Sequence, residues 1–125
     1  MKIPANLIPI LTLIEPTKDW EKMTIEMWVH HLIVANQSTI KYLPMRMLDG
    51  DQTDRILRQF PEKANEGNVN WDKLSGADWS CLLHTQPQFS VHCDWEKVSG
   101  IDWTLLLQKQ PQFAIYRNKR YEQYK

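Results

Sequence analysis

Two cysteines and two histidines that lie close together in the sequence are the residues best suited to metal chemistry. Cys81 and His84 are one helical turn apart, and His92 and Cys93 follow shortly after. Two thiolates with two imidazoles are a ligand set that binds zinc. Their spacing matches no common zinc-finger pattern. Zinc binding through Cys81, His84, His92 and Cys93 is therefore one alternative hypothesis, and no cofactor is expected.

Other reactive groups give weaker indications. His30 and His31 are adjacent, so in a helix their rings point to different faces and form no shared site. The segment from Tyr116 to Lys125 mixes basic and aromatic residues, which can serve RNA or DNA. No nucleophile elbow, P-loop, H-E-x-x-H or dinucleotide-binding glycine string is present in the sequence. We therefore expect no enzyme, and nucleic-acid binding through the basic C-terminal end is a second alternative.

The elements that must position these residues come from an internal repeat. When residues 71–94 are placed over residues 95–118, 12 of 24 positions are identical. The shared frame is W-x-K-[LV]-S-G-x-D-W-[ST]-x-L-L-x-x-Q-P-Q-F-[SA]. Fainter copies begin near residues 20 and 45, and the second of these has Met45 and Thr53 in place of tryptophans. We predict one domain over 1–125, with a cap (1–19), two diverged repeats (20–68), two regular repeats (69–118) and a tail (119–125).

The repeated frame predicts short helices. Ser75 and Asp78 have the spacing of a capping box, in which each side chain bonds the backbone amide of the other residue. The same box is predicted from Ser99 with Asp102 and from Asp49 with Gln52, and Thr24 supplies a cap alone. An apolar residue before each cap and a tryptophan five positions later have the spacing of a hydrophobic staple. We therefore interpret these residues as structural: Trp20, Trp28, Trp71, Trp79, Trp95, Trp103, Ser75, Asp78, Ser99 and Asp102.

Prolines set the predicted helix ends. Gln86-Pro87 ends the first helix of its copy, because a residue before proline avoids the helical region. Pro87 then opens a short second helix, 3₁₀-like in character, with Phe89 pointing inward. Copy one lacks this proline, so its first helix is predicted to be longer, from Trp28 through Gln37, with a second helix over 38–43. The predicted fold class is all-α: a short α-solenoid of about four helix–short-helix repeats with an N-terminal capping segment.

The long string W-x-K-L-S-G-x-D-W-S-x-L-L-x-x-Q-P-Q-F-A resembles a tandem repeat of bacterial proteins of uncharacterised function. The resemblance covers residues 69–116 closely and residues 20–68 weakly. It implies a short-helix repeat architecture and a bacterial or phage origin. It implies no established activity, so no functional residue is carried over.

Charge and composition narrow the class of partner. Lys plus Arg equals Asp plus Glu, 15 of each, so the formal net charge is zero. This argues against nucleic acid as the main partner, because phosphate binding needs a concentrated positive field. The apolar segment 3–14 is too short to span a bilayer, and two cysteines are too few for a disulfide scaffold. We expect a cytoplasmic protein with no membrane association.

In a solenoid, binding residues usually lie where the frame leaves the residue type free. Our leading hypothesis is therefore a protein-binding module, such as a small inhibitor, immunity or anti-defence protein that occludes an enzyme. A homodimer through an exposed repeat end is also possible on this pattern. The predicted partner-binding residues, several of which are expected to lie on solvent-facing helix surfaces and form one continuous strip, are Ala77, Ser80, His84, Thr85, His92, Ile101, Thr104, Gln108, Lys109 and Tyr116.

Overall fold

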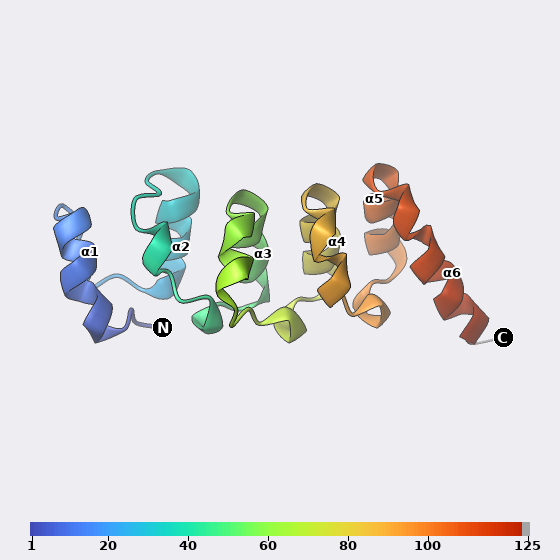
Figure 1. The fold of residues 1–125 in the computed structure, drawn as a ribbon, viewed down its shortest axis with the longest axis horizontal. Helices are drawn as coiled ribbons and strands as arrows, with labels where there is room; N and C mark the ends of the chain where they lie inside the picture. Colours follow the sequence, from blue (N-terminus) through green and yellow to red (C-terminus); the bar gives the residue numbers. More distant parts are fainter. Residues whose placement is uncertain (124–125) are drawn as a thin grey trace.

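Short helices stacked in chain order make up the molecule (Figure 1). A computed structural model describes residues 1–123, with side chains to residue 118. Within that part of the chain no β-strand forms, and an isolated bridge pairs Lys2 with Thr24. Figure 1 shows α1 to α6 side by side along the long axis, with a second set of short helices beside the first. The all-α repeat fold predicted from the sequence is confirmed.

The helices are of two kinds, α and 3₁₀, and the 3₁₀ segments are labelled η. The α-helices are α1 (Ile8–Ile14), α2 (Ile25–Val34), α3 (Gly50–Gln59), α4 (Gly76–Thr85), α5 (Gly100–Lys109) and α6 (Ala114–Gln123). The 3₁₀ helices are η1 (Ala5–Leu7), η2 (Ile40–Tyr42), η3 (Met45–Met47), η4 (Pro61–Glu66), η5 (Trp71–Lys73), η6 (Pro87–His92), η7 (Trp95–Lys97) and η8 (Pro111–Phe113).

Each repeat contributes one ten-residue α-helix, α2 to α5. We number positions 1 to 10 along each of these helices, so that position 4 is Trp28, Thr53, Trp79 or Trp103. The prediction that copy one has a longer helix is wrong, because α2 ends at Val34 as the others end at their tenth residue. The backbone amides of Ala35 and Asn36 both bond the carbonyl of His31. The turn closes there without a proline, and the second helix is only η2.

The predicted caps form in three copies and fail in the last. The Thr24 hydroxyl accepts from the Met27 amide at 3.1 Å. Both capping boxes, Asp49 with Gln52 and Ser75 with Asp78, are complete.

The predicted box of Ser99 with Asp102 is wrong. The Ser99 side chain makes no cap hydrogen bond, and the Asp102 amide bonds the Ser99 carbonyl instead. At the equivalent turns of α3 and α4, the position-1 glycine lies against the carbonyl of Lys73 or Lys97 from the next repeat. Nothing lies within 4 Å of the Cβ position at Gly100, whose φ is +37°. The last box therefore lacks the neighbour that holds the turn in the other copies.

The apolar frame residues form one continuous core. The staple residues Met23, Leu48, Leu74 and Val98 are buried, as are all four position-4 residues. Leu82 and Leu83 are fully buried, and Phe89 is 7% exposed. A ten-residue helix is too short to be stable alone in water, so this shared core stabilises the repeats together.

The frame glutamines join each of the two regular repeats to the repeat before it, a role that the sequence did not indicate. Gln86 Nε2 donates to the Arg58 carbonyl at 3.1 Å, and Gln110 Nε2 donates to the His84 carbonyl at 3.1 Å. Both acceptors are position-9 carbonyls near a helix end, where backbone acceptors lack partners within the helix. Gln88 Nε2 donates to Gln86 Oε1 at 2.8 Å and so fixes the orientation of the first amide. The Q-P-Q string thus caps the preceding helix.

Candidate functional site

Four variable positions of the repeat helices share one surface, which we call the outer helical face. It consists of positions 2, 6, 9 and 10 of α2 to α5, and every residue there is exposed or half-buried. These residues are Glu26, Asp51, Ala77, Ile101; His30, Arg55, Cys81, Leu105; Ile33, Arg58, His84, Gln108; and Val34, Gln59, Thr85, Lys109. No two adjacent helices carry the same residue at any of these positions. The repeat fold fixes where these side chains sit and leaves their chemistry free.

Two shallow hollows lie on this face and meet at Arg58. One, of about 250 Å³, runs between α3, α4 and α5 and is lined by Arg58, Ser80, Cys81, His84, Thr85, Leu105 and Gln108. The other, of about 300 Å³, lies between α2 and α3 and is lined by Ile33, Arg55, Arg58 and Gln59. Both are open, mixed polar and apolar surfaces. They suit side chains of a macromolecule better than an enclosed small ligand.

The predicted binding residues divide between this face and other surfaces. Ala77, Thr85, Ile101, Thr104, Gln108 and Lys109 are exposed, and His84 is half-buried. Ser80 is only 4% exposed, because position 5 faces the next helix and its hydroxyl donates to the Asp102 carbonyl at 2.9 Å. The expectation that Ser80 faces solvent is therefore wrong.

His92 lies on η6 and Tyr116 lies on α6, and both rings are held by aromatic stacking. The His92 ring lies 4.3 Å from the Trp71 ring at an angle of 6°, and the Tyr116 ring lies 4.4 Å from the Trp95 ring at 6°. Both side chains remain exposed on their other side. These two residues are therefore not part of the predicted strip, because they follow the helix-ending prolines and lie off the outer helical face.

The proposed zinc ligands are not brought together. Among the described residues, one group of three or more His, Cys, Asp or Glu side chains is close enough to share an ion. This group does not include Cys81, His84, His92 or Cys93. Cys81 and His84 line an outer hollow, whereas His92 stacks on Trp71. Burial raises the pKa of both thiols, that of Cys93 to about 12. Both cysteines are free thiols that favour the protonated form, which is a poor metal ligand.

The group that does assemble is acidic and lies between α3 and α4. Carboxylate oxygens of Asp51, Asp54 and Asp78 lie within 4.8 Å of one another. Asp54 is 2% exposed, and this burial raises its pKa to about 7. The positive charge of Arg58 acts to lower this pKa, and the negative charges of the other two carboxylates act to raise it. Arg58 Nε lies 3.0 Å from Asp54 Oδ1. The buried carboxylate thus has its counter-charge within the chain, and we assign no ion to the cluster.

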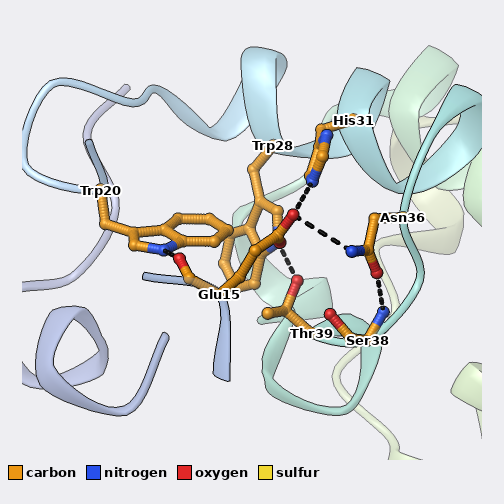
Figure 2. Close-up of polar contacts among 7 residues, drawn as sticks. All are labelled: Glu15, Trp20, Trp28, His31, Asn36, Ser38 and Thr39. Atoms are coloured by element: carbon orange, nitrogen blue, oxygen red, sulfur yellow. Dashed lines mark hydrogen bonds and ion pairs between the residues drawn. The ribbon is translucent and has the colours of Figure 1, made fainter. Parts of the chain in front are cut away.

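A second buried polar cluster joins the N-terminal cap to copy one (Figure 2). Glu15 Oε1 lies 2.8 Å from His31 Nε2 and accepts a hydrogen bond from Asn36 Nδ2 at 3.2 Å. The Glu15 carbonyl accepts from the Trp20 indole at 3.0 Å. Glu15 and His31 are each 9% exposed. A carboxylate beside an imidazole can act in acid–base catalysis, but this burial and these partners indicate a structural link.

The sequence predicted that the rings of His30 and His31 point to different faces, but it did not indicate the Glu15 partner of His31. Glu15 lies in the cap, outside the repeat frame, so no copy provides an equivalent residue for comparison. The two rings do point to different faces: His31 is buried, and His30, at position 6, is exposed.

Comparisons with known proteins provide no further assignment. No protein-family model, curated protein or solved structure matches the chain. In the described part of the chain, no helix has the length and apolar character needed to cross a membrane. The side chains of residues 119–125, which include most of the proposed basic nucleic-acid-binding end, lie outside the described residues.

Proposed function

We propose that the protein is a non-enzymatic protein-binding module that uses its outer helical face. The observation that carries this proposal is the separation of shared and variable residues. Frame residues are used in caps, core and inter-repeat hydrogen bonds, whereas the residues at helix positions 2, 6, 9 and 10, which differ between copies, are exposed or half-buried on one face. Exposed polar and aromatic residues that folding does not require are candidates for binding.

The chemistry of the face supports a macromolecular partner. It combines the exposed apolar side chains Val34 and Leu105 with Arg55, Arg58 and Lys109. Protein interfaces have this mixture of apolar contacts and polar edges. A small inhibitor or immunity protein that covers part of an enzyme is the form of this function that we favour, because a rigid row of helices presents a preorganised surface.

Site-specific photo-crosslinking in the source cells tests the proposal. A benzophenone amino acid replaces Thr85 on the outer helical face or, as the control, Val91, which is 82% exposed on η6. We expect position 85 to give a discrete adduct with a different protein and position 91 to give none. An adduct from position 91 alone, or from neither position, would contradict the proposal.

A further inference from the structure

The hollow between α3, α4 and α5 is lined by hydrogen-bond donors, and none of the described residues that line it is an aspartate or a glutamate. The groups that can donate are the guanidinium of Arg58, the imidazole of His84, the hydroxyl of Thr85 and the amide of Gln108. A positive charge beside neutral donors is the combination that binds an anion through charge-assisted hydrogen bonds. The hollow, of about 250 Å³, is open at the surface, so a side chain of another molecule can enter it.

Arg58 keeps donors available at this hollow. Its Nε lies 3.0 Å from Asp54 Oδ1, and its side chain is 38% exposed. A guanidinium has five N–H donors, so this contact leaves its terminal amino groups for a second acceptor. Burial raises the pKa of Asp54 to about 7, so at neutral pH this carboxyl is protonated in about half of the molecules and cancels the charge of Arg58 only in part.

Positive charge gathers on the half of the outer helical face that contains the hollow. Positions 6, 9 and 10 of α2 to α5 hold no aspartate or glutamate, and they hold Arg55, Arg58 and Lys109. The acidic residues of the face are Glu26 and Asp51, both at position 2. Each already lies 3.3 Å from a positively charged group, which for Asp51 is Arg55. An incoming anion therefore meets unpaired acidic groups on neither side of the hollow.

Backbone acceptors beside the hollow are also engaged. The carbonyl of Arg58, at the end of α3, accepts from Gln86, and the carbonyl of His84, at the end of α4, accepts from Gln110. Carbonyl groups at a helix end otherwise carry partial negative charge that repels anions. The two frame glutamines reduce this repulsion at the helix ends next to the hollow.

We infer that this hollow binds a carboxylate side chain of the partner protein, an aspartate or glutamate that pairs with Arg58 and accepts from the neighbouring donors. The inference rests on the proposed function and adds the chemistry of the partner's contact segment. Leu105, which also lines the hollow, is 50% exposed, so an apolar residue of the same segment has a contact there. A single guanidinium beside an apolar side chain suits one carboxylate, whereas a run of nucleic-acid phosphates needs a concentrated positive field.

The photo-crosslink from position 85 supplies the probe for a test, because Thr85 lines the same hollow. Mass spectrometry of the adduct identifies the segment of the partner that contacts the hollow. Two synthetic peptides of that segment are then titrated into the purified chain and followed by fluorescence anisotropy. One peptide has the natural sequence, and the other has Asn for every Asp and Gln for every Glu. We expect the natural peptide to bind at least about tenfold more tightly.

Substitutions in the hollow should remove this preference. Arg58→Gln should lower the affinity for the natural peptide at least about tenfold and leave the affinity for the amide peptide within about twofold. Gln108→Glu adds a carboxylate of nearly the same shape at an exposed site and should weaken the natural peptide by repulsion. This second variant keeps the contact of Arg58 with Asp54, so it tests the inference even if Arg58→Gln destabilises the fold. The matched control is Lys73→Gln, which removes an exposed positive charge on η5 and should change neither affinity.

Failure of the inference and failure of the proposed function give different results. If position 85 gives no protein adduct, or an adduct with RNA or DNA, both are overturned. If the adduct forms with a protein segment that has no Asp or Glu, or if the two peptides bind equally well, the inference alone is overturned. A loss of affinity in Lys73→Gln as large as that in Arg58→Gln would also overturn the inference, because it would show a general effect of charge and not a site at the hollow.

Discussion

The same pair of tryptophans is used in two different ways in the two halves of the molecule. In copy one the rings of Trp20 and Trp28 meet edge to face, at 77°, and both are buried. Both indole N–H groups are satisfied, that of Trp28 by the Thr39 hydroxyl at 2.9 Å. In the regular half Trp71 stacks on Trp79 at 14°, and the Trp79 N–H is buried without a hydrogen-bond partner.

The difference shows that the repeat frame sets the spacing of the tryptophans and their neighbours set the geometry. In the regular half, an aromatic residue from the second helix extends the stack, and the first tryptophan stays half-buried. In copy one, the cap supplies polar partners instead, through the Glu15 carbonyl and side chain. Polar contacts therefore stabilise copy one, and aromatic stacks stabilise the regular half.

The largest expected effect comes from removing the first half's buried indole. Trp28→Ala should cost about 4 kcal/mol of unfolding free energy, because it opens a cavity and leaves Thr39 without its donor. Trp71→Ala should cost about 2 kcal/mol, because Trp71 is half-buried and its neighbours can partly relax. Urea unfolding of both variants measures the difference. If Trp71→Ala costs as much as Trp28→Ala, the two halves do not differ as we describe.

Breaking the cap's polar link should have the next largest effect. Glu15→Ala should cost about 3 kcal/mol, since it removes the partner of buried His31 and of Asn36. A double-mutant cycle with His31→Ala should be strongly non-additive, because both substitutions break the same contact. Additive effects of the two substitutions would show that the 2.8 Å contact contributes nothing to stability.

The second copy, which has Met45 and Thr53 in place of the tryptophans, should make the stability of the protein depend on pH. Folded Asp54 keeps its proton up to about pH 7, whereas its ordinary pKa is 3.8. The folded state therefore binds more protons than the unfolded state between these values, and stability should decrease as pH rises from about 4 to 7, by on the order of 2 kcal/mol. Asp54→Asn should remove much of this decrease, and the control Asp51→Asn, at an exposed site, should keep it. A wild-type stability that rises between pH 5 and 8 would contradict the assignment.

The smallest expected effect compares two serines in equivalent positions of the regular half. Ser75→Ala should cost about 1 kcal/mol, because it removes a complete capping box. Ser99→Ala should change stability by less than about 0.3 kcal/mol, because Ser99 makes no cap hydrogen bond. Thermal unfolding resolves this difference. Equal losses of stability in the two variants would mean that the capping box of Ser99 and Asp102 forms in solution.

The sequence predicted the elements that recur and missed those that depend on neighbours in space. Helix starts at Thr24, Asp49 and Ser75 follow from local capping chemistry, and the ends before Pro61, Pro87 and Pro111 follow from proline sterics. The Ser99 cap does not form, and no carbonyl of another repeat lies against Gly100 as it does against Gly50 and Gly76. The Glu15–His31 contact depends on how residues 1–19 fold back on α2, which no local pattern encodes.

The candidate site was predictable in part for the same reason. Comparing two copies identified variable positions, and most of them are exposed on α4 and α5. Variability alone did not reveal that position 5 faces the next helix, so Ser80 was assigned to solvent. It also did not separate the outer helical face from the stacked rings of His92 and Tyr116.

The most direct test of the central claim measures binding and stability in the same variant. The double substitution Arg55→Ala/His84→Ala changes two residues of the outer helical face and no frame residue. We predict that it lowers the yield of the position-85 photo-adduct at least tenfold while changing the unfolding free energy by less than about 1 kcal/mol. An undiminished adduct, or a loss of adduct matched by Ser75→Ala, which only destabilises the fold, would contradict the claim that these side chains bind a partner.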